Sequence, residues 1–431
     1  MNGMSRGAFL RKAGVVGATV PLAGLLVEGP ALASTRRLGR TGGASAVPKN
    51  QATGQSVLVS PPVANNIYWD GWSAGAQAAC GALGMKAKVE NFSGDTNRQL
   101  GSFQNIQTLG LKGVMTMANV AASSPKLFGT AQRQKVYGVN SHSNQPWSTP
   151  LDIGDYYVEY LEPNGPAAFE SISTFIFKKM GGKGKVLHIS GLQGTSASDY
   201  RDIGFNAAAK KFPGIQVVGT EYGGFSRVAT VPVVENLLTV HPDVQAIICQ
   251  NDDSAIGAIS VLKKKGLKAL VTGFDGVPEA LDAIVSGDMA ATVANSGPWL
   301  GRAMIVRIFD AMNGVKLPAV ERMMQFEAFT VNTPAAAKLY KKQTYGTGDP
   351  YDVPLMSRFL NPQDWDMQIG MNTVNPATLW APFESAKPKG YKLPQGYLQA
   401  TKADYAKADA MYKAHLKRDG FAAVKKLNTP F

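Results

Sequence analysis

Cysteine and histidine are both scarce in this chain of 431 residues, which has two of the first and four of the second. Cys80 and Cys249 are too few for a disulfide framework or a cysteine-based zinc site. Both lie in apolar helical or strand contexts, so we expect buried, unpaired thiols, with a disulfide between the lobes as the alternative. The four histidines show no spacing typical of metal ligands. We therefore expect no metal and no other cofactor.

Motifs of common enzyme classes are also missing. The first predicted strand is followed by Ser60-Pro-Pro-Val-Ala, whereas a dinucleotide-binding dehydrogenase needs a Gly-x-Gly-x-x-Gly turn at that point. The Gly-x-Ser-x-Gly spacing occurs at Gly71-Trp-Ser-Ala-Gly75, but it lies within the predicted helix over 71–83 and not at the strand-to-helix turn of a nucleophile elbow. The chain contains no His-Glu-x-x-His zinc motif. We therefore predict that the protein is not an enzyme.

The positive net charge of +13 is confined to the two ends of the chain. Residues 1–50 hold seven Lys/Arg and one acidic residue, and residues 387–431 hold ten Lys/Arg and three acidic residues. Residues 51–386 carry 27 side chains of each sign. Because nucleic-acid binding depends on a local excess of cations, the neutral body argues against a nucleic-acid partner.

The N-terminal segment has the pattern of an export signal. Basic residues such as Arg11 and Lys12 precede an apolar stretch over 13–27, which is too short to span a bilayer. Ala31-Leu-Ala33 then supplies the small-x-small pattern of a signal peptidase site. We predict a signal peptide over 1–33, which implies a periplasmic protein.

The export route stays open. Ser5 to Arg11 resembles the twin-arginine export motif except at Gly7, where the second arginine would stand. The general secretory route is the alternative. Residues 34–54 follow the cleavage site, and their content of Arg, Gly and Ser predicts a flexible leader.

From residue 56 onward, short apolar runs alternate with helical stretches. Continuous apolar strands separated by helices indicate parallel sheets covered on both faces. The pattern starts again after Gly165, so we predict two doubly wound α/β lobes, with a ligand cleft beyond the carboxyl ends of the strands. The predicted strands span 56–60, 87–92, 113–117, 135–139, 185–190, 215–218, 246–249 and 269–274. The predicted helices span 71–83, 96–109, 199–212, 231–239, 254–265 and 277–286.

Four segments between about residues 55 and 333 carry a family resemblance. They are Asn65-Asn-Ile-Tyr-Trp69, Gly191 to Phe205, His241 to Ala258 and Thr272 to Asn295. In this order they resemble the ribose/galactose type of periplasmic binding protein, the type I solute-binding fold. The resemblance implies the soluble component of an ABC importer that binds a sugar or polyol between two closing lobes.

The resemblance also implies a domain organisation and a partner. The N-terminal lobe would span 55–163 and 296–325, and the C-terminal lobe 164–295 and 326–333. Residues 334–431 form an extension of unknown role beyond the family's usual end. The partner would be an ABC permease in the inner membrane, and the protein would be a monomer. A periplasmic sensor that presents its ligand to a chemoreceptor or histidine kinase is the alternative.

Site residues follow from matching the family motifs position by position. Aromatic faces would sandwich the ring and amide or carboxylate groups would grip hydroxyls. The matched residues are Asn66, Tyr68, Trp69, Phe225, Asn251, Asp275 and Asn295.

Several of these residues also have purely structural interpretations. Asp275 could serve solely as the cap of the helix that begins near 277, and Asn251 could serve solely to stabilise its loop. Tyr68 and Trp69 could be core aromatics. We regard Arg201 as structural.

Two positions depart from the ribose-type pattern. Asn140-Ser141-His142 stands where those receptors carry Asp-Arg, and Asp199 stands in place of a ligand arginine. This puts ribose itself in doubt. Asn140 and Asp199 remain candidate ligand-binding residues that would govern which ligand is chosen.

Overall fold

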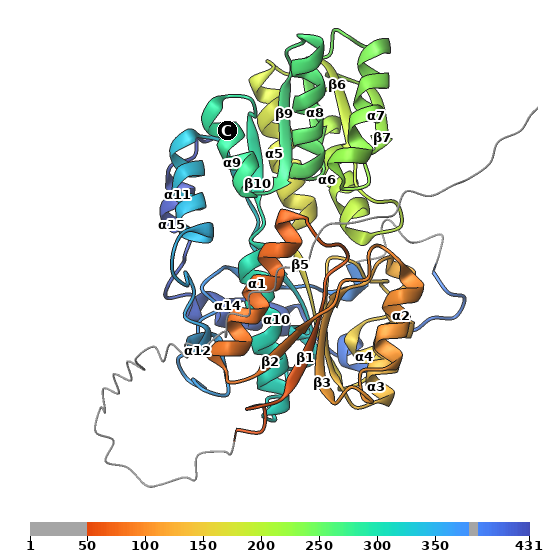
Figure 1. The fold of residues 1–431 in the computed structure, drawn as a ribbon, viewed down its shortest axis with the longest axis vertical. Helices are drawn as coiled ribbons and strands as arrows, with labels where there is room; N and C mark the ends of the chain where they lie inside the picture. The colour runs from red at the N-terminus through yellow and green to blue at the C-terminus, as the bar shows by residue number, and fades with distance from the viewer. Residues whose placement is uncertain (1–49, 379–386) are drawn as a thin grey trace, which may run out of the picture. The chain divides into compact units, whose positions relative to one another are not determined.

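The computed structural model describes residues 50–378 and 387–431. The predicted signal peptide (1–33) and most of the predicted leader lie outside the described residues. Two separate sheets form the framework, with helices packed around each (Figure 1). The prediction of two α/β lobes is therefore confirmed. Across the described ranges, no helix combines the length and the apolar character needed to cross a membrane.

The first lobe is built on a seven-stranded sheet with the order β13-β11-β5-β4-β3-β1-β2. All pairings are parallel except that of β13 with β11. Its strands are β1 (Ser56–Ser60), β2 (Lys86–Val89), β3 (Leu111–Met117), β4 (Tyr137–Ser141), β5 (Tyr157–Pro163), β11 (Met323–Phe326) and β13 (Met371–Thr373). Its helices are α1 (Ile67–Ala82), α2 (Thr96–Gln104), η1 (Ala121–Ser123), α3 (Ser124–Arg133), α4 (Pro150–Ile153) and α10 (Gly297–Met312), with η2 (Ala319–Glu321) before β11.

The second lobe is built on a six-stranded sheet with the order β12-β10-β9-β8-β6-β7. Only the pairing of β12 with β10 is antiparallel. Its strands are β6 (Lys183–Ser190), β7 (Gly214–Tyr222), β8 (Ala246–Cys249), β9 (Leu270–Asp275), β10 (Ala291–Ala294) and β12 (Phe329–Val331). Its helices are α5 (Gly165–Lys179), α6 (Ser196–Lys211), α7 (Arg227–Val240), α8 (Asp252–Lys265) and α9 (Pro278–Ser286).

The chain passes between the lobes at three points before residue 334. The first crossing joins β5 to α5 at Asn164, and the second joins β10 to α10 at Asn295–Ser296. The third joins β11 to β12 after Phe326. Cys80 and Cys249 are buried and not bonded to each other.

Helices α1 and α10 approach each other unusually closely through glycines. A Cβ atom added at Gly75 would lie 2.2 Å from the carbonyl oxygen of Pro298. A Cβ atom at Gly301 would lie 2.0 Å from the carbonyl oxygen of Trp72. Only residues without a side chain fit at these two positions. The close contact fixes the position of α1, whose first turn carries candidate site residues.

Residues 334–431 add to both lobes and do not form a separate domain (Figure 1). On the second lobe, α11 packs on α9 and α15 packs on α11. On the first lobe, β13 pairs with β11, α12 packs on α10, α13 on η2, and α14 on β13 and η2. The extension therefore crosses between the lobes twice more. Its elements are α11 (Pro334–Tyr345), α12 (Val353–Met356), η3 (Pro376–Thr378), α13 (Gln395–Leu398), α14 (Lys402–His415) and α15 (Ala422–Lys426).

A buried charge network holds the extension on the first lobe. The Arg307 guanidinium donates from Nε to Glu159 Oε2 at 2.9 Å and from Nη2 to the Tyr412 hydroxyl at 2.8 Å. That hydroxyl donates to Glu321 at 3.2 Å. Burial raises the pKa of Glu159 to about 7, and the neighbouring Arg307 opposes this shift. The extension thus covers charges that would otherwise lie on the outside of α10 and β5.

Candidate ligand-binding site

A cavity of about 610 Å³ lies between the two lobes, lined by loops that follow strands of both sheets. This is where doubly wound sheets bind ligands, because the carboxyl ends of parallel strands meet at one edge. The structure brings six of the nine predicted site residues to the cavity wall. They are Asn66, Tyr68, Trp69, Phe225, Asn251 and Asp275.

The first lobe contributes an aromatic wall from the start of α1. Asn66 caps the helix, its Oδ1 accepting from the backbone N–H groups of Tyr68 and Trp69 at 3.1 and 3.2 Å. The cap places both rings on the first turn, where their centroids stand 5.1 Å apart in an edge-to-face arrangement. The Tyr68 hydroxyl lies 2.9 Å from Nε2 of His142. Burial lowers the pKa of His142 to about 3, so this imidazole is neutral.

Phe225 forms the opposing aromatic face on the second lobe. Its ring lies directly over the backbone of Gly191, where an added Cβ would stand 2.0 Å from the ring. The Arg201 guanidinium stands 5.3 Å from the Phe225 ring and 3.8 Å from the Phe274 ring. Its Nη1 donates to the carbonyl of Gln250 at 2.6 Å, while no described residue accepts a bond from its buried Nε. Arg201 therefore stiffens the aromatic wall and keeps one donor at the cavity.

Asp275 and Asn295 bring polar groups to the back of the cavity. Asp275 ends β9 and is 7% exposed, and Asn295 directly follows β10 and is fully buried. The Asn295 amide lies close to the Tyr68 hydroxyl and the Asp275 carboxyl and lowers the pKa of both groups. Asn295 itself does not line the cavity. Burial raises the pKa of Asp275 well above its ordinary value, and Arg201 opposes that shift.

Asn66 and Asn251 already use their amides within the protein. Asn251 caps α8 by accepting from the Ser254 N–H at 3.0 Å and donates to the carbonyl of Phe225 at 3.1 Å. Asn66 donates across the cleft to Asp253 at 2.7 Å. Three further bonds also join the lobes. The Ala121 N–H donates to the carbonyl of Gly194, the Ser196 hydroxyl donates to the carbonyl of Asn144, and the Asn144 N–H donates to the Ser196 hydroxyl. The two lobes are therefore in contact around the cavity.

Asn140 and Asp199, the two residues expected to govern ligand choice, do not line the cavity. Asn140 is fully buried at the end of β4, where its amide accepts from the Ala118 N–H at 3.2 Å and donates to the carbonyl of Ser143 at 2.8 Å. Asp199 lies in the first turn of α6, and burial together with the nearby Asp202 raises its pKa to about 6. Asn140 shapes the loop that carries His142, and His142 reaches the cavity instead.

Sequence reasoning missed several cavity residues. Arg201 was assigned a structural role, and His142 was noted only as part of a departure from the family pattern. Arg227 and Glu279 stand at the start of α7 and α9, where Arg227 Nη2 contacts Asp253 at 3.3 Å and Glu279 at 2.5 Å. Asp253 could have been found from its position two residues after Asn251, in the first turn of the helix that follows β8.

Backbone strain is concentrated at the cavity. Seven described residues other than glycine have a positive φ, and four of them line it: Asn65, His142, Phe225 and Asp275. The φ of Asp275 is 134°, a conformation that costs about 1–3 kcal/mol and persists only where surrounding contacts enforce it. This clustering is typical of a functional site.

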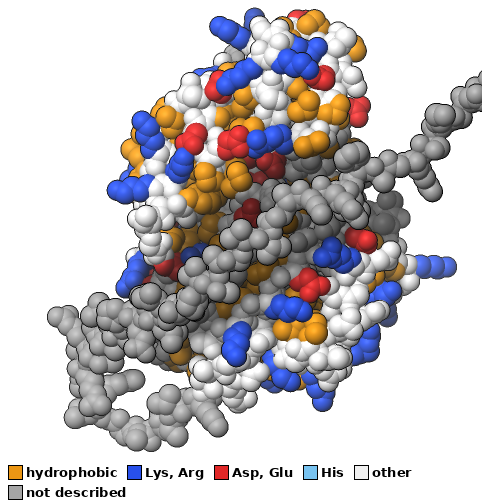
Figure 2. Space-filling model, viewed as in Figure 1, with side chains coloured by type: hydrophobic (Ala, Val, Ile, Leu, Met, Phe, Trp, Pro, Cys, Tyr) orange, Lys and Arg blue, Asp and Glu red, His pale blue; other side chains and the backbone are white. Residues whose placement is uncertain are grey.

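The charges at the cavity disfavour an anionic ligand. Its wall carries Arg201 and Arg227 against Asp253, Asp275 and Glu279. Arg227 is paired with two of these carboxylates, and Arg201 is buried between aromatic rings. On the face that Figure 2 shows, Lys and Arg side chains are interspersed with Asp and Glu. The site therefore suits a neutral molecule with hydroxyl groups and apolar faces.

Comparison with known proteins agrees with this geometry. Residues 57–316 match a family model described as a periplasmic binding protein domain. The ribose import binding protein of Haemophilus influenzae is 28% identical over 279 residues, covering 64% of this chain and 91% of that protein. The D-allose-binding periplasmic protein of Escherichia coli is 25% identical over 268 residues, covering 61% and 86%.

Among solved structures, a twin-arginine translocation pathway signal protein from Burkholderia phytofirmans is similar, with a TM-score of 0.66 and 25% identity. The match covers 70% of this chain and 96% of that one. The family model spans more than half of the chain and coincides with the two lobes that enclose the cavity. This chain therefore belongs to the periplasmic binding protein domain family, with the type I fold of sugar-binding ABC solute-binding proteins.

Proposed function

We propose that this protein is the exported, non-enzymatic receptor of an ABC importer and that it binds a neutral sugar or polyol. The observation that carries the proposal is the cavity between the lobes, which combines opposed aromatic faces with strand-end polar groups. Tyr68 and Trp69 line the cavity from the first lobe and Phe225 from the second. Asp275 supplies a hydrogen-bonding group at the wall, and the buried Asn295 lies beside it. Aromatic faces suit the C–H surfaces of a sugar, and amide or carboxylate groups suit its hydroxyls.

Ligand binding would be coupled to lobe closure. A ligand held by both lobes favours the state in which they touch, because its contacts to both lobes exist only there. The hydrogen bond from Asn66 to Asp253 joins the lobes at the cavity and would form in that closed state. An inner-membrane permease would then recognise the closed form.

A thermal-shift screen tests the binding proposal. The panel should hold D-ribose, D-allose, xylitol and myo-inositol as neutral compounds, with ribose 5-phosphate and gluconate as anionic controls. A ligand at one hundred times its Kd stabilises the folded state by about 2.7 kcal/mol, which is readily seen as a rise in Tm. One or more neutral compounds should raise the Tm, and calorimetry should then give one site per chain.

Two outcomes would contradict the proposal. Stabilisation by the anionic controls alone would mean that Arg201 or Arg227 binds an anion, contrary to the preference for a neutral ligand. Chemical change of the bound compound during prolonged incubation, followed by NMR, would mean that the protein is an enzyme. To test import, the purified protein with its ligand should stimulate ATP hydrolysis by the reconstituted permease.

A further inference from the structure

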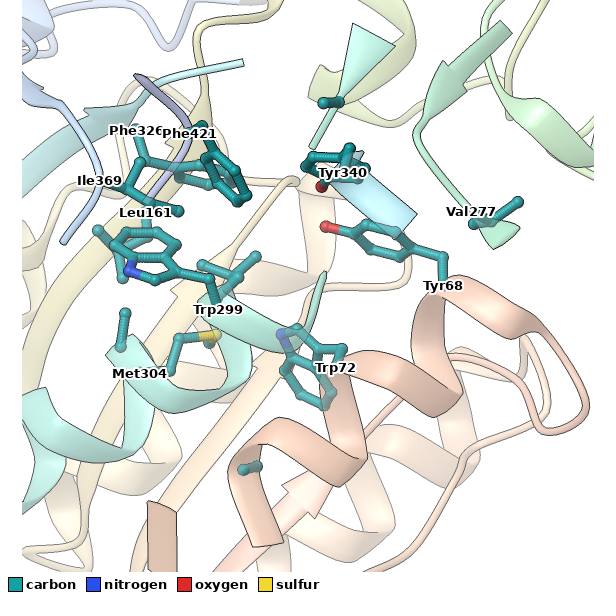
Figure 3. Close-up of a cluster of buried hydrophobic side chains, with 14 of the residues drawn as sticks. Tyr68, Trp72, Leu161, Val277, Trp299, Met304, Phe326, Tyr340, Ile369 and Phe421 are labelled. Carbon is teal, nitrogen blue, oxygen red and sulfur yellow. The ribbon is translucent and has the colours of Figure 1, made fainter. Parts of the chain in front are cut away.

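Tyrosines from the C-terminal extension lie directly behind the candidate site. Tyr340, on α11, is fully buried, and its ring packs on the backbone of Gly276, where an added Cβ would stand 3.0 Å from the ring. Gly276 directly follows Asp275. Figure 3 shows the hydroxyl end of Tyr340 facing that of Tyr68. One side chain of the extension thus touches the loop of the second lobe and faces an aromatic residue of the first.

Two further tyrosines extend this wall. Tyr345, also on α11, stands 3.7 Å from where a Cβ would lie at Gly71 in α1. The Tyr351 hydroxyl lies 3.1 Å from the Ser296 hydroxyl. Ser296 follows Asn295 and caps α10 by accepting from the Trp299 N–H. Tyr345 therefore contacts the helix whose first turn carries Tyr68 and Trp69. Tyr351 contacts the residue that follows Asn295.

The loop that Tyr340 supports needs such a wall. Asp275 and Gly276 both have positive φ values, of 134° and 69°. A strained loop relaxes unless its surroundings leave no room for another conformation. The Val277 N–H donates to Asp252 Oδ2 at 2.9 Å and anchors the end of the loop. At Gly276 the nearest atoms belong to Tyr340 and Ala294, so the Tyr340 ring limits the room that the loop has there.

We propose that Tyr340 is a positioning residue of the ligand site, through which the extension holds Asp275 and Tyr68 in their binding conformations. The inference deepens the proposed function and rests on it only for its effect on affinity. The effect on the loop itself does not depend on which ligand binds. The two can therefore be tested separately.

Hydrogen exchange of the ligand-free protein tests the positioning directly. In Tyr340→Ala, peptides that cover 66–72 and 270–281 should exchange at least tenfold faster than in the wild type. Peptides from the core strands β6 and β8 should keep their wild-type rates. Tyr405→Ala is the matched control, since Tyr405 is a buried tyrosine of the extension that packs on Val320 and Ala408 and does not line the cavity. It should leave both site peptides unchanged.

Ring and hydroxyl can be separated with Tyr340→Phe, which keeps the ring and should exchange like the wild type. If Tyr340→Ala does not fold, Tyr340→Leu takes its place, because it keeps part of the volume but not the flat ring. Unchanged exchange in the site peptides of a folded Ala or Leu variant would overturn the proposal. Equal acceleration in every peptide would also overturn it, because that pattern means a general loss of stability.

Affinity for the panel compound that raises the Tm most supplies the second readout. Its Kd should rise at least tenfold in Tyr340→Ala and stay within threefold of the wild type in Tyr340→Phe and Tyr405→Ala. An unchanged Kd in Tyr340→Ala would overturn the positioning role. If no panel compound binds, the proposed function fails, and hydrogen exchange alone decides the role of Tyr340.

Discussion

At the scale of single residues, Asp275 combines three unusual properties. Its φ is strongly positive, its carboxyl is almost buried, and it lies beside the fully buried amide of Asn295. The positive charge of Arg201, on α6, opposes the rise in the pKa of Asp275. A group kept in such a costly setting needs a compensating interaction, and a ligand hydroxyl would supply one.

We expect Asp275→Ala to weaken ligand binding by about tenfold to a few hundredfold. Removing one partner of a desolvated hydrogen bond costs about 1–3 kcal/mol, more when the group is charged, and about 1.4 kcal/mol corresponds to a factor of ten. Calorimetry with the best panel compound measures the change. Asp282→Ala is the control, since Asp282 lies on the exposed side of α9 and pairs with Lys341. Equal affinity in a folded Asp275→Ala variant would show that the site is misplaced.

His188 should make the folded state sensitive to acid. It is buried, its ring stacks on Phe205 at 3.9 Å, and burial lowers its pKa to about 3. The unfolded chain takes up a proton near pH 6.5, whereas the folded protein does not until about pH 3. The free energy of unfolding that this residue contributes therefore falls as the pH drops through that window.

Between pH 7 and pH 5, this residue should lower the free energy of unfolding by about 2 kcal/mol. His188→Leu should remove that part of the pH dependence, whatever its effect on stability at pH 7. Urea unfolding of both proteins at the two pH values measures it. The same drop in variant and wild type would mean that the histidine is protonated in the folded state.

Sequence patterns located those residues that lie at, or a few residues beyond, the end of a predictable strand. Asn251 and Asp275 reached the cavity as expected, because each lies at or just beyond the end of a strand whose end was predictable. Phe225 also lines the cavity, although the strand before it ends at Tyr222 and was predicted to end at 218. Asn140 also ends a strand, but its short side chain turns back to bond its own loop. His142, two residues further on, lines the cavity instead and has a positive φ, which sequence patterns do not reveal.

At the scale of elements, the glycine contact between α1 and α10 sets the position of the first-lobe aromatic wall. Pro298 and Trp72 carbonyls stand where side chains at Gly75 and Gly301 would be. A Cβ at either position would push the helices apart. Since Asn66, Tyr68 and Trp69 are at the start of α1, separation would also move the site.

Gly75→Ala should therefore lower the free energy of unfolding by about 1–3 kcal/mol, the usual cost of overpacking a core. Gly81→Ala is a matched control on the same helix, because no atom lies within 4 Å of the added Cβ. There the better helix propensity of alanine should stabilise the protein by up to about 1 kcal/mol. Urea unfolding of the two variants should give opposite signs, and two equal changes would contradict the close packing.

Most of the apolar strands, and the helices between them, were predictable, and β1 and β8 have the predicted bounds. Helix α1 begins at Ile67, four residues earlier than predicted, because the Asn66 cap was not recognised as one. Helix α10 escaped prediction altogether. All sixteen of its residues are buried, so it lacks the polar face that gives a helix its periodic signature.

At the scale of the whole molecule, the extension and the first lobe depend on each other. Arg307 and Glu159 are 1% and 0% exposed, and Tyr412 completes their bonding. Nothing in the sequence links positions 159, 307 and 412, because the pairing depends on the fold. The role of residues 334–431 could not be predicted for that reason.

Arg307→Leu should lower the free energy of unfolding by about 3–5 kcal/mol, because it leaves a buried carboxyl without its partner. Lys341→Leu breaks the exposed pair with Asp282 and should cost at most about 1 kcal/mol. The double variant Arg307→Leu/Glu159→Leu should recover much of the loss. Urea unfolding of all three tests the network, and a cost for Arg307→Leu as small as that for Lys341→Leu would contradict it.

The late position of β13, α14 and α15 in the chain has a consequence for biogenesis. A chain still being synthesised presents its N-terminal residues first, and a domain made of contiguous sequence can begin to fold at once. Here the first sheet is complete only once Met371–Thr373 have been made. The buried charge network of Arg307 also needs Tyr412, and the second lobe needs the helix that contains Val424. Neither lobe can be completed before residues 371–424 have been made. Until Tyr412 has been made, Arg307 lacks one of its hydrogen-bond partners, which gives chaperones a long interval in which to act.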